Sequence, residues 1–76
     1  MERLTRSDIN CYLKIFFRSG TRINKETNKS IEWITENGKR YVVQKSNGHV
    51  KYQDENGEWK DEPFATREIR HMFFGY

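Results

Sequence analysis

The side chains best suited to chemistry in this 76-residue chain lie between residues 33 and 60, where a tryptophan is followed by basic and amide residues. On a β-strand, every second side chain points to the same face of the sheet. An aromatic ring among bases and amides can stack on a nucleobase, or form the centre of a protein interface within a polar rim. We expect one sheet face to collect Trp33, Arg40, Val42, Gln44, Lys51, Gln53 and Lys60.

Residues with catalytic or metal-binding potential are few. The chain has one cysteine, Cys11, and two histidines, His49 and His71, which cannot make up a Cys/His zinc set. No motif places a nucleophile or a carboxylate beside either histidine, and the five glycines form no phosphate-binding loop. We therefore expect a protein that is not an enzyme and that uses no metal and no cofactor.

Three Asn-Gly pairs, at 37–38, 47–48 and 56–57, give the strongest local structural signal. Asn-Gly favours the two-residue type I′ turn of a β-hairpin, because both central residues of that turn need positive φ. The spacing predicts an antiparallel meander over about 30–62, with strands at 30–36, 39–46, 49–55 and 58–62. Pro63 cannot donate a ladder hydrogen bond, so the last strand is expected to be a short edge strand.

Two-residue turns would also fix which residues share a face. They pair Trp33 with Val42 and Gln53 with Lys60, and leave these side chains on a polar face. The opposite face, which we expect the helices to cover, collects Ile34, Tyr41, Val43, Val50, Tyr52 and Trp59. The competing interpretation is that Trp33 packs beneath the 19–29 segment as part of the core.

Helical spacing of apolar residues appears at both ends of the chain, over about 7–18 and about 65–74. Residues 19–29 have no clear periodicity and predict a basic loop with Arg22, Lys25 and Lys29 as further binding residues. The whole chain, 1–76, is expected to be one small α+β domain with the order α-β-β-β-β-α and both helices on one sheet face.

Composition limits the location and the partners. No apolar run is long enough for a membrane span or resembles a signal peptide, which predicts a cytoplasmic protein without a membrane partner. Residues 1–53 carry eleven Lys or Arg and five acids, whereas residues 54–76 carry three and six. Such asymmetry suits a nucleic-acid footprint, and equally the docking of a protein by opposite charge.

A sheet followed by a helix that opens near Phe64-x-Thr66 resembles the small β-sheet DNA readers, the integrase arm-binding and plant AP2-type domains. The resemblance covers about 31–73 and is one of arrangement rather than motif. It implies that the exposed sheet face contacts DNA. The chain departs from those families in its long N-terminal helix and its acidic 54–62 segment.

The small size and the Lys- and Asn-rich composition also look like accessory proteins of phages and mobile elements, which often inhibit a host protein. The sequence therefore predicts a non-enzymatic binding module that modulates a partner macromolecule through the polar sheet face. Protein and nucleic acid stay open as partners. A structural homodimer, formed through Ile15, Phe17 and the apolar residues 72–76, is a further alternative.

Overall fold

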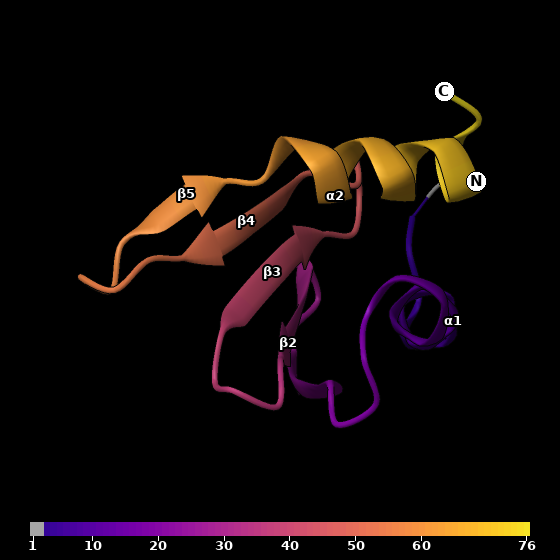
Figure 1. Ribbon diagram of the computed structural model, residues 1–76. Helices are drawn as coiled ribbons and strands as arrows, with labels where there is room; N and C mark the ends of the chain where they lie inside the picture. The colour runs from indigo at the N-terminus through magenta and orange to yellow at the C-terminus, as the bar shows by residue number, and fades with distance from the viewer. Residues whose placement is uncertain (1–2) are drawn as a thin grey trace.

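A computed structural model describes residues 3–76 of the chain (Figure 1). It confirms an α+β fold in which an antiparallel β-meander lies between two helical ends, with strand order β1-β2-β3-β4-β5. Within these residues no helix has the length and apolar character needed to cross a membrane. The elements are α1 (Arg6–Phe16), β1 (Arg22–Glu26), β2 (Ser30–Ile34), β3 (Arg40–Gln44), β4 (Val50–Gln53), β5 (Trp59–Asp61), α2 (Pro63–Ile69) and the π-helical turn η1 (Arg70–Phe74).

The first strand corrects the prediction of a basic loop over 19–29. Residues Arg22–Glu26 pair antiparallel with β2, with an irregularity between Ile23 and Lys25. The strand was missed because its sequence, Arg-Ile-Asn-Lys-Glu, has a single apolar residue and so shows no alternation. Ile23 pairs with Trp33, and this contact with the core holds an otherwise polar strand on the sheet.

Helix α1 begins with a complete capping box. The Thr5 side chain accepts a hydrogen bond from the Asp8 backbone N–H, and the Asp8 carboxylate accepts one from the Thr5 N–H. The helix buries Ile9, Tyr12 and Leu13 on one face. It ends at Phe16, two residues earlier than predicted, because Phe17 is extended.

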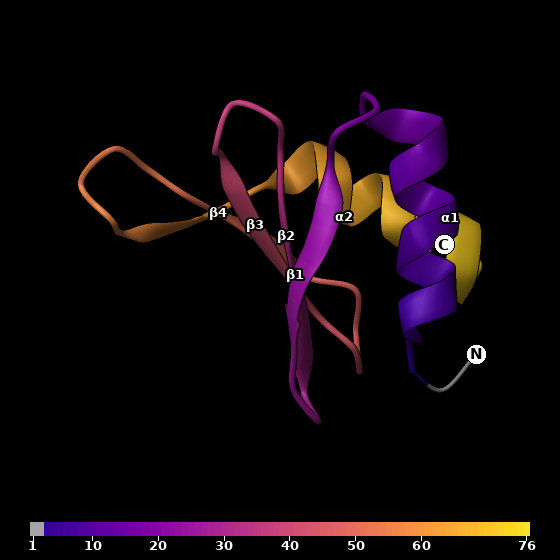
Figure 2. The same cartoon turned by 90° about the horizontal axis from the view of Figure 1, so that it is seen from below.

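Both helical ends lie on the same side of the sheet, which leaves the opposite face open (Figure 2). On the covered side, Trp33 is completely buried and stacks on Tyr41 with ring centroids 5.5 Å apart. The edge-on rings of Tyr12 and Phe17 complete this aromatic cluster, at 6.1 and 5.8 Å from Trp33. Large rings thus supply much of the core area of a small domain.

Tyr12 also links the two helical ends through a polar contact. Its hydroxyl donates a hydrogen bond of 2.8 Å to the Glu68 carboxylate of α2. Burial, this bond and the negative charge of Glu68 raise the pKa of the Tyr12 phenol well above its ordinary value of 10.0. The phenol therefore stays protonated far into the alkaline range.

The C-terminal helix starts earlier than predicted, at Pro63, directly after β5. Within it, the Thr66 hydroxyl accepts from the Val50 N–H at 2.9 Å and donates to the Glu62 carbonyl at 2.8 Å. The first of these bonds ties α2 to the first residue of β4. The following turn, η1, packs Met72, Phe73 and Phe74 against the core.

The three hairpin turns are longer than predicted. Thr35 pairs with Lys39, and Asp54 with Glu58, so the first and third loops have three residues, 36–38 and 55–57. Gln44 pairs with His49, which leaves four residues, 45–48, in the second loop. In all three, glycine has positive φ and asparagine does not, whereas a type I′ turn would need both.

Loop length decides the faces because each extra residue turns the following side chains over. One extra residue in the first and third turns reverses the faces predicted for β2 and β5. Two extra residues in the second turn keep β3 and β4 on their predicted faces. Trp33 and Lys60 therefore move to the covered side, where Ile31 also lies. Ile34 and Trp59 move to the open side.

Candidate functional site: the open face of the sheet

The open face, as we define it, consists of two rows of side chains that cross the strands. The pairing register connects Lys25, Glu32, Val42, Lys51 and Asp61 into one continuous row from β1 to β5. The second row joins Arg22 to Ile34 and Ile34 to Arg40, and at the far edge joins Gln53 to Trp59. Neighbouring strands lie roughly 4.8 Å apart, so each row is about 19 Å long.

Apolar and aromatic side chains occupy the middle and one edge of this face. Ile34 and Val42 lie on this face and are half-buried by their neighbours. Trp59 is 39% exposed on the edge strand, whereas Trp33 is fully buried. The open face therefore offers one accessible indole ring for stacking.

The acidic residues of the open face each have a basic partner. Arg40 lies 3.7 Å from the Glu32 carboxylate, and His49, which precedes β4, lies 2.9 Å from Asp61. Among residues 3–76, Arg22, Lys25 and Lys51 form no ion pair. The basic side chains in excess on this face are thus the ones that remain free to attract an anion.

The structure brings most of the predicted site residues together. Arg40, Val42, Gln44, Lys51 and Gln53 lie on the open side of β3 and β4, as predicted. The Gln44 amide oxygen accepts from Asn47, and the Gln53 amide donates to the Gly57 carbonyl, so both amides also stabilise turns. Arg22 and Lys25, predicted as loop residues, join them from β1.

Three predicted residues lie elsewhere. Trp33 is in the core, so its assignment to the binding face was wrong. Lys60 pairs with Tyr52 on the covered side, where its ammonium lies 3.9 Å from Asp54. Lys29 is exposed in the loop between β1 and β2, beyond the end of the two rows.

Sequence reasoning missed Trp59 and the carboxylate beside His49. Both errors come from the third turn, because a two-residue loop places Trp59 and Asp61 on the wrong face. The signal that could have found them is the repeated Glu-Asn-Gly at 36–38 and 55–57, preceded by Thr35 and Asp54. Both preceding side chains accept a backbone N–H from the residue that closes the loop, which favours the three-residue form.

Comparison with known proteins adds no identification. No protein-family model, no curated protein and no solved structure matches this chain. A function for this chain is therefore inferred from the open face itself.

Proposed function

We propose that this protein is a non-enzymatic binding module and that its open face binds nucleic acid. The observation that carries the proposal is a combination on one uncovered sheet face. The basic side chains of Arg22, Lys25 and Lys51, which form no ion pair within residues 3–76, lie there together with the accessible ring of Trp59. Basic side chains follow a phosphate backbone, and an aromatic ring stacks on an exposed base whatever its identity.

The dimensions of the open face support a short single strand as the ligand. Rows of about 19 Å hold a few nucleotides, in the lower part of the range of about 4–16 that single-strand modules bind. The basic side chains come from β1 and β4, whereas Trp59 comes from β5. A nucleic-acid strand that contacts all of them must therefore cross the sheet. Its affinity would come from phosphate contacts and stacking rather than from reading of base edges.

A fluorescence titration with short mixed-sequence oligonucleotides at low salt tests this proposal. Trp59 is the reporter, because Trp33 is buried away from the ligand. We expect the emission to change, and the affinity to fall with salt on a log–log slope of about −2 when three side chains each neutralise one phosphate. The Trp59→Phe variant assigns the signal to the exposed ring.

A matched pair of lysine variants separates the two sheet faces. Lys51→Gln removes a base from the open face and should reduce the salt slope by about 0.7, the value for one phosphate contact on a single strand. Lys60→Gln removes a base from the neighbouring strand on the covered side and should leave the slope unchanged. Equal effects of the two variants, or no response of Trp59, would exclude the open face as the nucleic-acid site.

A protein partner is the second candidate, and the half-buried apolar pair Ile34 and Val42 favours it. Apolar side chains inside a polar rim with a tryptophan are typical of a protein-binding hot spot. The accessory-protein role suggested by composition, modulation of a host protein, would use the same face. Capture of one specific protein from nuclease-treated extract, lost in Trp59→Ala, would support this function over nucleic-acid binding.

A further inference from the structure

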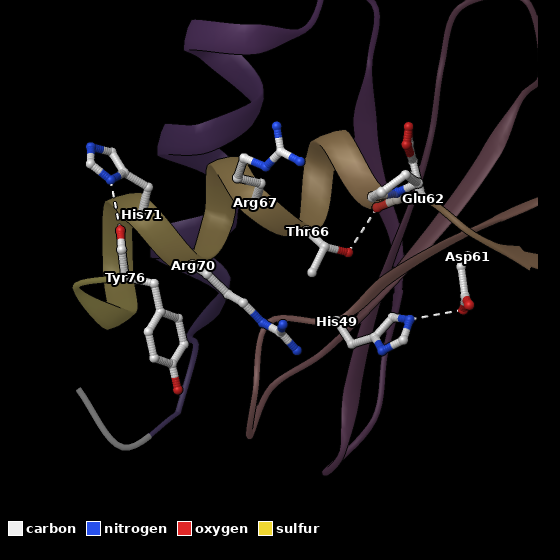
Figure 3. Close-up of a pocket in the computed structure, with 9 residues that line it drawn as sticks. His49, Asp61, Glu62, Thr66, Arg67, Arg70, His71 and Tyr76 are labelled. Atoms are coloured by element: carbon white, nitrogen blue, oxygen red, sulfur yellow. Dashed lines mark hydrogen bonds and ion pairs between the residues drawn. The ribbon is translucent and has the colours of Figure 1, made fainter.

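A cleft of about 800 Å³ lies where the sheet meets the C-terminal helices, and its walls include His49, Asp61, Thr66, Arg70 and Tyr76 (Figure 3). His49 pairs with Gln44, next to the row that contains Val42 and Lys51. The cleft is therefore a continuation of the open face toward α2. Figure 3 shows the Tyr76 ring on one side of the Arg70 side chain and the His49 ring on the other.

Arg70 is the side chain that gives this cleft its chemistry. Its Nε donates a hydrogen bond of 2.9 Å to the Asn47 carbonyl, which fixes the plane of the guanidinium. Within residues 3–76, its two terminal nitrogens have no hydrogen-bond partner, and the guanidinium carbon lies 6.0 Å from the Tyr76 ring centre. A guanidinium held in this way presents two parallel N–H groups to an oxyanion at little entropic cost.

His49 can supply a second donor beside Arg70. Its Nε2 lies 2.9 Å from the Asp61 carboxylate, which orients the ring, and Figure 3 shows the Arg70 guanidinium extending toward that ring. The remaining nitrogen, Nδ1, donates only when the imidazole is protonated. The charged groups that face this ring are Asp61 of β5 and Arg70 of η1. Glu62 and Arg67 also line the cleft, but Figure 3 shows their charged ends pointing away from His49 and Arg70.

We propose that this cleft binds a phosphate group, with Arg70 as the principal ligand and His49 as the second. The inference rests on the proposed function in one respect: a strand lying on the open face would reach the cleft with its terminal phosphate. Free phosphate presents the same oxygens, so the two sources share one recognition chemistry.

Titration with inorganic phosphate at constant ionic strength, followed by NMR, tests the cleft directly. We expect saturable shifts of the His49 ring and of the Arg70 Nε–H, and affinity about tenfold weaker in Arg70→Gln, since charge-assisted hydrogen bonds are lost. Arg67→Gln, three residues earlier in α2, is the matched control and should bind like the parent, because the Arg67 guanidinium lies over the Phe64 ring, 6.0 Å from its centre. Shifts that do not saturate, or equal loss in both variants, would overturn the proposal.

His49→Gln keeps the test decisive if Arg70→Gln fails to fold. Glutamine can still donate to Asp61 but cannot carry the positive charge of histidine. Phosphate binding by the parent should strengthen on acidification, because a protonated His49 gains a second donor. We expect the variant to bind phosphate more weakly than the parent at acidic pH and to show no such strengthening. Unchanged binding over the whole pH range would remove His49 from the site.

Oligonucleotides with and without a 5′-phosphate distinguish the two sources of phosphate. If the phosphorylated strand binds more tightly, and Arg70→Gln abolishes this preference, the cleft binds the terminal phosphate of a strand. Equal binding of both strands by a protein that binds inorganic phosphate would assign it to free phosphate. If strands bind but inorganic phosphate does not, the cleft proposal fails alone. If phosphate binds but no strand does, only the proposed function fails.

Discussion

Trp33 and Trp59 lie on opposite faces of one sheet and have opposite environments. Trp33 is sealed beneath α1 against Tyr12, Phe17 and Tyr41, whereas Trp59 is 39% exposed on the edge strand. Trp33 is followed in the sequence by the apolar Ile34, and Trp59 by the basic Lys60. These neighbours do not show which of the two rings is buried. The difference shows that the number of residues in a turn, rather than the residue itself, decides which tryptophan can meet a ligand.

The largest expected effect is that of removing the buried ring. Trp33→Ala should lower the free energy of unfolding by about 3–5 kcal/mol, the usual range for truncating a buried aromatic side chain. Chemical denaturation followed by circular dichroism measures it. A domain of this size has a total stability of roughly 4–11 kcal/mol, so the variant is expected to be largely unfolded on warming. A loss below 1 kcal/mol would contradict the burial of Trp33.

The turns that assign residues to faces give the next effect. Gly38 and Gly48 both have positive φ, at 89° and 75°. An added Cβ at Gly38 meets nothing within 4 Å, but at Gly48 it would approach Phe74 at 3.1 Å and Ile69 at 3.2 Å. Gly38→Ala should therefore cost only the backbone penalty of about 1–2 kcal/mol, and Gly48→Ala should cost more.

Thermal melting of the two glycine variants measures this difference under one set of conditions. Their backbone penalties are similar, so the excess in Gly48→Ala reports the contact between the second turn and the C-terminal helices. Equal melting temperatures would show that η1 does not pack on that turn.

On the covered side, Tyr12 makes the free energy of unfolding fall as the pH becomes alkaline. Its pKa is raised in the folded protein, so the unfolded chain loses the phenolic proton first. The stabilisation that Tyr12 gives to the folded protein is fully present below pH 10.0, the ordinary pKa of the phenol, and is lost as the pH rises above that value. Tyr12→Phe removes the hydrogen bond to Glu68 and should lower the free energy of unfolding by about 1.5 kcal/mol at neutral pH. In alkali, the free energy of unfolding of this variant should decline less steeply than that of the parent. Denaturation at pH 7 and pH 11 compares the two proteins.

The smallest expected effect on stability is that of Trp59→Ala, below about 1 kcal/mol because the ring is partly exposed on a short edge strand. The same variant should remove the acrylamide-quenchable part of the fluorescence and leave the shielded emission of Trp33. Trp33→Phe is the converse control. If Trp59→Ala unfolded the protein, the open face would be part of the core.

Much of the fold was predictable because local signals agreed with the tertiary structure. The Asn-Gly pairs located all three turns of the meander, and the apolar stripe of Ile9, Tyr12 and Leu13 located α1. Strand β1 was not predictable, since its polar residues gain stability only from pairing with β2 and from the contact of Ile23 with Trp33. The site was partly predictable, because β3 and β4 kept their faces through an even change in loop length.

The sequence alone determined that this chain forms an α+β domain whose sheet carries bases and amides on the β3 and β4 positions of one face. Only the tertiary structure decided which tryptophan accompanies them. It also placed His49 beside Asp61 and directed Arg70 into the same cleft. The physical reason is that pairing register is set by backbone hydrogen bonds and core packing across the whole sheet. A single residue in a turn exchanges every side chain of the next strand between core and solvent.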